Sequence, residues 1–254
     1  MASTETLIEY LLDKGDIDSL IHVGGHHGEE IDFYSSYNLK KVIYFEPVKA
    51  FSEIISNKIN KKNLDNFEVY NLGLGAENVD QEIFIADGTS SGSTSLLEPR
   101  PSDITFSNKE KVKIRTFKSL NLGKIDLGII DTQGFELEVL KGLEEEIYNF
   151  KYLVVEFNVS EGYIGQVVFS DLDNYLSSKS FTRIKTVRKI NQKKYNDVNY
   201  GDAIYINNKL ISNLRVNYQK ISNKFFDSFL YRMILILRDI PFHKKQIKKI
   251  IKRS

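Results

Sequence analysis

Short apolar runs alternate along the chain with segments whose apolar residues recur at helical spacing, and this alternation limits the fold more than any other feature. The runs at 19–23, 42–45, 125–130 and 152–157 are too short for buried helices and carry few polar residues. Such runs are typical of strands covered on both faces. Strands of this kind with helices between them form a mostly parallel sheet, so the chain is predicted to adopt an α/β fold.

The remaining elements complete a predicted sheet of seven strands. A further strand is expected at 67–72, and the last two strands, 181–187 and 203–206, have no clear helix between them. Two strands joined without a helix can pair as an antiparallel hairpin. The other expected elements are helices at 4–14, 29–37, 50–59, 134–143 and 172–178, and two extra strands at 81–86 and 112–116.

The charge of the chain is divided unevenly between two regions. Residues 211–254 hold 11 Lys/Arg and 2 Asp/Glu, a balance of +9, which leaves 24 and 32, a balance of −8, for residues 1–210. The basic segment also has amphipathic helical spacing over 220–238. We therefore expect a domain at 1–210 and a basic helical extension at 211–254. The extension either contacts an anionic membrane surface peripherally or packs as an ordinary solvated helix. Nucleic acid is disfavoured as a partner because the acidic body would repel phosphates.

The composition also limits the possible cellular location of the chain and the kinds of crosslink and metal site that it can form. It has no cysteine, which excludes disulfides and thiolate metal sites. Its first residues show no basic segment followed by an apolar stretch, and no apolar run is long enough to span a membrane. These features favour a cytoplasmic protein, with peripheral membrane contact left open. The oligomeric state has no signature in the sequence.

A glycine-rich loop, Gly24-Gly25-His26-His27-Gly28, follows the first strand. Glycine lets the backbone approach a bound nucleoside without a Cβ in the way. The second strand ends in Glu46, 18 residues beyond Gly28. A carboxylate at that place can accept hydrogen bonds from both hydroxyls of a ribose. The combination favours a cofactor that contains adenosine over a plain strand-to-helix turn.

The residues after this loop discriminate between two such cofactors. A dinucleotide places its pyrophosphate on the N-terminus of the first helix, which here carries Glu29 and Glu30. Two carboxylates suit the helix dipole but would repel a diphosphate. S-adenosylmethionine has no phosphate and carries a positive sulfonium and ammonium group. The acidic residues therefore favour S-adenosylmethionine over a nicotinamide dinucleotide.

Two acidic residues are predicted to lie at the carboxyl ends of later strands. Asp131 follows the strand at 125–130, and Glu156 lies near the end of the strand at 152–157. Function collects at this edge of an open α/β sheet, so both side chains should face the crevice that holds the cofactor. They can act as a general base, bind the cofactor's amino group or hold a divalent cation. Asp131 can instead cap a helix, and Glu136 can be only a partner of the helix dipole.

Three of the four histidines lie around the glycine loop. His22 belongs to the first strand and is expected to be a packed strand residue. His26 and His27 lie in the loop itself, so at least one of them should face the site. Histidine is a common general base or metal ligand, which makes His26 a candidate for either role.

Six segments, taken in order, resemble the FkbM family of methyltransferases, and they cover about three-quarters of the chain, from residue 19 to residue 207. Each segment is weakly specific alone, but six with matching order and spacing are specific together. The family more often has Ala in place of Gly25 and Asn in place of His26, which leaves the role of the histidines open. The segments are Ile21-His-Val-Gly-Gly-His-His-Gly28, Val42-Ile-Tyr-Phe-Glu-Pro47, Asn71-Leu-Gly-Leu-Gly75, Asp131-Thr-Gln-Gly-Phe-Glu136 with Leu140-Lys-Gly142, Val154-Val-Glu-Phe-Asn158 and Gly201-Asp-Ala-Ile-Tyr205.

The resemblance implies a Rossmann-like class I methyltransferase fold, in which an antiparallel hairpin closes a mostly parallel sheet. It also implies O-methylation, often of a sugar or polyketide hydroxyl, so we expect a carbohydrate or another hydroxylated small molecule as acceptor. The residues expected at the cofactor are Val23, Gly24, Gly25, His26, Gly28, Glu46, Pro47, Asn71, Leu72, Gly73 and Asp131.

An alkyl hydroxyl is a poor nucleophile at neutral pH, so a base or a metal must assist its methylation. Asp131, Glu156 and His26 are the candidates for the base. A divalent metal such as Mg²⁺ is an alternative that no motif supports. The polar loop at 89–95 is expected to cover the acceptor. Two other functions stay open: a non-catalytic binding protein that keeps the fold, and a nicotinamide-dependent oxidoreductase.

Overall fold

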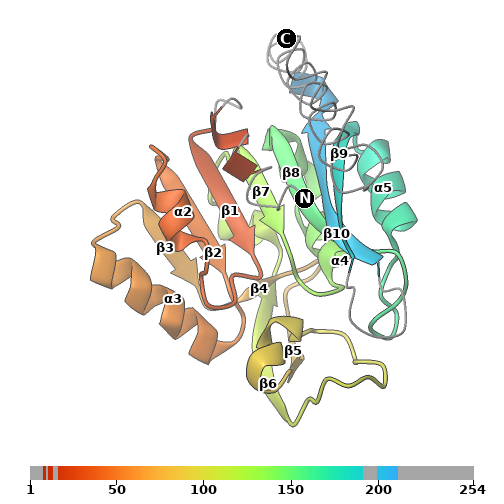
Figure 1. Ribbon diagram of the computed structural model, residues 1–254. Coiled ribbons are helices and arrows are strands. Elements are labelled where there is room, and N and C mark those ends of the chain that lie inside the picture. Colours follow the sequence, from red (N-terminus) through yellow and green to blue (C-terminus); the bar gives the residue numbers. More distant parts are fainter. Residues whose placement is uncertain (1–7, 10, 14–16, 191–198, 211–254) are drawn as a thin grey trace, which may run out of the picture. The chain divides into compact units, whose positions relative to one another are not determined.

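The computed structural model describes residues 8–9, 11–13, 17–190 and 199–210, and the predicted extension at 211–254 lies outside them. The chain divides into two units, Met1–Lys209 and Leu210–Ser254. No helix in the described residues is long and apolar enough to cross a membrane. The elements of the first unit, labelled in Figure 1 where there is room, are β1 (Ser19–Val23), α2 (Ile31–Ser35), β2 (Lys41–Phe45), α3 (Lys49–Lys62), β3 (Phe67–Tyr70), β4 (Gly73–Leu74), β5 (Val79–Ile85), η1 (Gly88–Ser93), β6 (Asn108–Arg115), η2 (Phe117–Leu120), β7 (Leu127–Ile130), α4 (Glu136–Gly142), η3 (Glu144–Asn149), β8 (Tyr152–Asn158), α5 (Phe169–Ser178), β9 (Phe181–Ile190), β10 (Asn199–Asn207) and η4 (Asn208–Leu210).

Seven strands form the main sheet in the order β3-β2-β1-β7-β8-β10-β9. The first five are parallel to one another, and β10 is antiparallel to both β8 and β9. The central strands β1, β2, β7 and β8 are almost wholly buried, which is why they appear in the sequence as continuous apolar runs. The structure confirms the predicted Rossmann-like class I methyltransferase fold, a mostly parallel seven-stranded sheet closed by an antiparallel hairpin.

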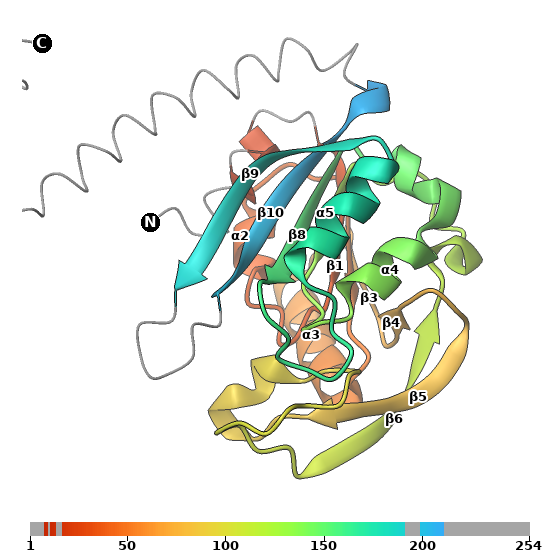
Figure 2. The same cartoon turned by 90° about the vertical axis from the view of Figure 1, so that its right-hand side faces the viewer.

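Helices cover both faces of this sheet, with α2 and α3 on one side and α4 and α5 on the other (Figures 1 and 2). Successive side chains of β1 point to opposite faces of the sheet, so this strand packs against the helices on both sides. Val23 belongs to the core cluster that contains Leu140 of α4 and Leu176 of α5. His22 points to the opposite layer, where its ring stacks on Tyr44 and its Nδ1 hydrogen bonds to the hydroxyl of Tyr34 in α2 at 3.1 Å. His22 is thus the packed strand residue that its position predicts.

A second sheet of three strands, β4-β6-β5, lies at the carboxyl ends of the parallel strands (Figure 2). Strands β5 and β6 are the two predicted extra strands, and each begins before its predicted range and ends one residue short of it. Along β6 one face is exposed, while Val112 and Ile114 on the other pack with Ile83 and Val48 in a small core of their own. The insertion between β5 and β6 therefore stands on this sheet, above the edge where the glycine loop lies.

Three predicted elements have different limits in the structure. The helix expected at 29–37 is only Ile31–Ser35, because Gly28 closes a turn in which its N–H donates to Gly25 O at 2.7 Å. The strand expected at 67–72 ends at Tyr70, and the chain then turns into β4. Within the loop expected at 89–95, residues 88–93 form the short 3₁₀ helix η1.

Candidate active site

A pocket opens at the carboxyl ends of β1, β2 and β7, under the insertion that carries η1. Eight of the residues predicted to contact a cofactor line it: Val23, Gly24, Gly25, His26, Glu46, Pro47, Gly73 and Asp131. The remaining walls include the acidic pair Glu29 and Glu30, and side chains of the insertion such as Ser91 and Leu96. Ser91, Gly92 and Thr94 of the loop at 89–95 also line this pocket, while the contact of this loop with the acceptor stays a prediction.

Gly24 is the point at which three strand ends meet. Its φ is +87°, and its N–H donates to Phe45 O of β2 at 3.0 Å. A Cβ at this position would lie 1.7 Å from the carbonyl oxygen of Asp131, after β7. Only glycine therefore allows the loop after β1 to pass this close to the end of β7.

Glu46 is buried in the pocket wall, with 4% of its surface exposed. Its Oε2 accepts a hydrogen bond from the backbone N–H of His26 and its Oε1 accepts one from that of Val48, both at 2.8 Å. Burial raises the pKa of Glu46 to about 8, with a further contribution from the charges of Glu110 and Glu29. Each carboxylate oxygen has two lone pairs, so capacity for two more donors is left.

Three residues predicted to contact a cofactor do not line the pocket but support it. Gly28 closes the turn of the glycine loop. The side-chain amide of Asn71 donates to the carbonyl oxygens of Glu46 and Pro47, at 3.1 and 2.9 Å, and so holds the turn after β2. Leu72 packs against the main hydrophobic core.

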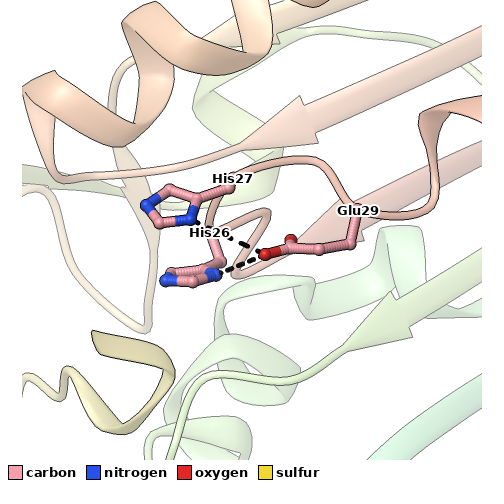
Figure 3. Close-up of side chains that lie close together, drawn as sticks. All are labelled: His26, His27 and Glu29. Atoms are coloured by element: carbon pink, nitrogen blue, oxygen red, sulfur yellow. Dashed lines mark hydrogen bonds and ion pairs between the residues drawn. The ribbon is translucent and has the colours of Figure 1, made fainter. Parts of the chain in front are cut away.

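His26 connects the glycine loop to the insertion. Its Nδ1 lies 2.8 Å from Oε1 of Glu29 (Figure 3). Its Nε2 lies 2.9 Å from the hydroxyl of Ser91 in η1. Its ring stacks on that of His27, with 3.8 Å between the centroids, and both rings meet Phe51 edge-on. Both ring nitrogens of His26 therefore have partners, and the residue connects the glycine loop to the insertion.

The same residues form a compact set of potential metal ligands. Within the described residues, one group of three such side chains, His26, His27 and Glu29, has donor atoms that lie within 4.8 Å of one another (Figure 3). Burial raises the pKa of Glu29, but hydrogen bonds from its own backbone and from His26 lower it overall, so the carboxylate is ionised. The His26–Glu29 hydrogen bond accounts for this geometry without a metal.

The structure brings Asp131 and Glu156 together, but only Asp131 lines the pocket, whereas Glu156 lines the cavity beside it. The side-chain amide of Gln133 donates one hydrogen bond to Asp131 Oδ1 and one to Glu156 Oε2, both at 2.8 Å. Glu156 is buried in β8, and Asp202 of β10 lies opposite it in the sheet. Burial and, next, the charge of Asp131 raise the pKa of Glu156 well above its usual range. Glu156 therefore resists ionisation beside Asp131.

Glu136 shapes the loop that carries these residues. Its Oε1 accepts hydrogen bonds from the backbone N–H and the hydroxyl of Thr132, at 2.9 and 3.2 Å, and from the N–H of Gly134 at 3.0 Å. It is fully enclosed, and burial raises its pKa to about 7. Glu136 thus holds residues 131–134 in place through hydrogen bonds and is not only a partner of the helix dipole.

Comparison with known proteins identifies the family. The family model described as the methyltransferase FkbM domain matches residues 22–183, well over half of the chain. The chain belongs to the FkbM methyltransferase family. By family and fold it is an S-adenosylmethionine-dependent methyltransferase. No curated protein sequence matches it significantly.

Solved structures with a similar fold are distant in sequence from this FkbM methyltransferase. An FkbM methyltransferase from Methylobacillus flagellatus KT is 16% identical, with a TM-score of 0.47 over 75% of this chain and 44% of that chain. Magnesium protoporphyrin IX methyltransferase from Synechocystis PCC 6803 with bound S-adenosylmethionine is 11% identical, with a TM-score of 0.48 over 80% and 76%. A SAM-dependent methyltransferase from Aquifex aeolicus is 16% identical, with a TM-score of 0.46 over 80% and 88%. The chain thus spans less than half the length of the M. flagellatus protein.

A groove lies beside the pocket of this FkbM methyltransferase, between the insertion and the loop after β8. The two walls are tied together: Ile164 N–H donates to Glu98 O at 2.8 Å, and the hydroxyl of Tyr163 donates to Ser93 O at 2.7 Å. Gly92 and Gln133 line both the groove and the pocket. The groove is lined by Gly92, Ser93, Pro99, Arg100, Ser102, Ile104, Phe106, Gln133, Glu156, Asn158, Gly162, Tyr163 and Tyr200.

Sequence reasoning missed two residues at the centre of this FkbM methyltransferase site. Phe51 stands in the first turn of α3 as an ordinary apolar helix residue, and no pattern predicts that it lines the pocket. Gln133 is part of the segment Asp131-Thr-Gln-Gly-Phe-Glu136, but the sequence alone assigns it no role. Its place as a polar residue between Asp131 and Gly134, close after a buried strand, is the available signal.

Proposed function

We propose that this FkbM methyltransferase methylates a hydroxyl group of a sugar or glycan. The observation that carries the proposal is the Asp131–Gln133–Glu156 group, which lies where the pocket meets the groove. When bound, S-adenosylmethionine supplies a methyl group whose bond to the sulfonium sulfur breaks, with the electron pair left on sulfur, as the acceptor oxygen bonds to the methyl carbon. The chain's own residues must hold the reactants and take up the hydroxyl proton.

The pocket residues fit this cofactor. Glu46 offers a buried carboxylate with free lone pairs to the two hydroxyls of a ribose. The glycine loop leaves space for a nucleoside, as the missing Cβ of Gly24 illustrates. Glu29 and Glu30 place two carboxylates in the wall, where they attract a cationic amino-acid portion and would repel a diphosphate.

Asp131 is the residue we assign as general base. It lies in the pocket wall at the end of β7, and Gln133 holds one of its oxygens. Burial raises the pKa of Glu156 and so opposes its ionisation, and Glu156 does not line the pocket, so we assign the proton of the acceptor hydroxyl to Asp131. His26, the third candidate, has Glu29 on one ring nitrogen and Ser91 on the other, so it does not share the Gln133 contacts of the other two.

The test begins with the cofactor and then follows turnover. We expect the protein to bind S-adenosylmethionine in a calorimeter and to release S-adenosylhomocysteine when glycans of the source cells are added. Asp131→Ala should reduce turnover about 100-fold or more, the usual contribution of a general base. Asp65→Asn, at an exposed position remote from the pocket, is the matched control. Absence of cofactor binding would refute the proposal, as would full turnover in Asp131→Ala.

A non-catalytic protein with the same fold is the second candidate. Such a protein would bind S-adenosylmethionine but never release S-adenosylhomocysteine on any acceptor. Asp131 favours the enzyme, because a protein that only binds the cofactor needs the glycine loop and Glu46 but no base in the pocket wall.

A further inference from the structure

Gln133 occupies an unusual position between the two cavities. Its φ is +53°, in the left-handed region that costs a residue with a Cβ about 1 kcal/mol or more. Its backbone carbonyl accepts a hydrogen bond from the hydroxyl of Ser95 at 2.7 Å, and its side chain donates to Asp131 and Glu156. Strained residues held in this way from several sides cluster at functional sites.

The two N–H bonds of the Gln133 amide are divided between the two carboxyl groups. A primary amide has two such donors on one nitrogen, so both acidic side chains are held at fixed positions by one group. Glutamate would present oxygen to two carboxyl groups, and asparagine is shorter by one methylene. The residue type is therefore matched to this double contact.

The groove has the chemistry of a site for an uncharged, polyhydroxylated ring. Phe106, Tyr163 and Tyr200 provide aromatic surface, while Asn158 and the inner carboxyl of Glu156 provide hydrogen-bonding groups. Flat apolar faces with a few convergent polar groups are what a pyranose ring requires. Among the described residues that line the groove, Arg100 is the one cation, and it forms an ion pair with Glu161. This described part of the lining therefore offers no unpaired cation to a phosphorylated acceptor.

We propose that the groove binds the pyranose ring of the acceptor, and that Gln133 is the positioning residue that sets Asp131 and Glu156 at its inner end. This inference rests on the proposed methyl transfer and adds the place and charge of the acceptor. The ring enters between Tyr163 and Phe106, and its reacting hydroxyl passes Gln133 to reach Asp131 in the pocket.

The binding part is tested with a fluorescent reporter. The chain has no tryptophan, so Phe106→Trp places a single indole in the groove, and Phe33→Trp places one in α2 as the matched control. The probes are the methyl glycosides of glucose, galactose and mannose, with glucose 6-phosphate for comparison. At least one glycoside should change the emission of Phe106→Trp saturably and leave Phe33→Trp unchanged, and glucose 6-phosphate should bind at least tenfold more weakly. Silence with all three glycosides, or stronger binding of the phosphate, would overturn the groove assignment.

The positioning part is tested with Gln133→Gly. Glycine accepts a positive φ without strain, so this variant removes the side chain and leaves the turn intact. Asn121→Gly, at an exposed residue with φ +49°, makes the same kind of change elsewhere. The readout is the titration of the Glu156 carboxyl carbon by ¹³C NMR, which needs no acceptor.

A donated hydrogen bond favours the ionised carboxylate, so its loss in Gln133→Gly should raise the pKa of Glu156 further. Asp131, Glu136, Tyr163 and Asp202, which face Glu156 from neighbouring elements, are unchanged in this variant. Equal titration of Glu156 in the wild type and in Gln133→Gly would refute the positioning role. The failures are separable, because loss of the proposed function shows as absent binding of S-adenosylmethionine by the wild-type protein.

Discussion

At the scale of single residues, the site depends on a few groups placed where a side chain of another kind would fail. Glu46 is a carboxyl in the pocket wall whose two oxygens each serve one backbone N–H. Gly24 is a backbone position that no Cβ can occupy. We therefore expect Glu46 to determine how the cofactor site responds to pH, and Gly24 to determine whether the ends of β1, β2 and β7 can meet.

Glu46→Gln should weaken the binding of S-adenosylmethionine about 10- to 100-fold, because hydrogen bonds to a charged acceptor contribute about 1.5–3 kcal/mol. The pKa of Glu46 is raised to about 8 by burial, and ribose hydroxyls donate to the ionised form, so cofactor binding should release a proton. Affinity of the wild type should then rise from pH 6 to pH 8. Calorimetry in buffers of different ionisation enthalpy measures both effects, with the exposed Glu68→Gln as control. An unchanged affinity in Glu46→Gln would contradict the role given to this carboxyl.

Gly24→Ala should destabilise the fold by about 2 kcal/mol or more, because its Cβ would lie 1.7 Å from the carbonyl oxygen of Asp131. Gly123→Ala is the matched control, since Gly123 has a φ of +78° and nothing within 4 Å of its missing Cβ. That control should cost only the backbone penalty of about 1 kcal/mol. Urea unfolding of the two variants gives the comparison, and equal losses would show that the close approach at Gly24 is unimportant.

At the scale of elements, the insertion between β5 and β6 completes both cavities. Its 3₁₀ helix η1 is tied to the glycine loop through the hydrogen bond between Ser91 and His26. The same insertion is tied to the loop after β8 through Tyr163 and Ser93. The second sheet is thus the support that holds one segment against two different parts of the main sheet.

Ser91→Ala removes the hydrogen bond between η1 and the glycine loop, and it should weaken the binding of S-adenosylmethionine about two- to tenfold. That range corresponds to a neutral hydrogen bond of about 0.5–1.5 kcal/mol. The effect should appear as faster dissociation in stopped-flow measurements, because the insertion covers the pocket. Thr89→Ala, at an exposed position of the same element that does not line the pocket, is the control. Equal dissociation rates in the two variants would separate η1 from cofactor retention.

The sequence predicted the main sheet closely because burial on both faces leaves a direct signature in β1, β2, β7 and β8. It placed β5 and β6 but underestimated their length, since their charged residues lie on an exposed face and carry little signal. Asp131 and Glu156 could be paired because parallel strands end at one edge. The two hydrogen bonds from the Gln133 amide could not be predicted, because they depend on a positive φ that a single glutamine in the sequence does not indicate.

At the scale of the whole molecule, the pKa shifts of four buried acids differ between the two edges of the sheet. Glu46, Glu136 and Glu156 lie at the carboxyl edge, and burial raises the pKa of each. Asp126 lies at the other edge, where burial is outweighed by the N–H of Asp18, the ion pair with Lys151 and the hydroxyl of Ser19, which lower its pKa. Burial thus makes the three acids at the pocket edge harder to ionise, whereas its contacts make Asp126 at the opposite edge easier to ionise.

This division makes folding stability fall as the pH rises through the neutral range. A carboxyl whose folded pKa is raised keeps a proton that the unfolded chain has lost, so its contribution is complete below the unfolded value and is lost as pH rises through the folded one. For Glu136, with a pKa of about 7 against 4.5 when unperturbed, the loss between pH 5.5 and pH 8 is roughly 2 kcal/mol.

Glu136→Gln keeps an oxygen for Thr132 and Gly134 and cannot ionise, so it should lose less stability over this interval. Urea unfolding at the two pH values, with the exposed Glu145→Gln as control, measures the difference. His27, whose pKa burial lowers, acts in the opposite direction, but it is common to all three proteins and cancels. A decline in Glu136→Gln as steep as in the wild type would mean that Glu136 is already ionised when buried, and the hydrogen bonds that hold residues 131–134 would then be accepted by a charged carboxylate.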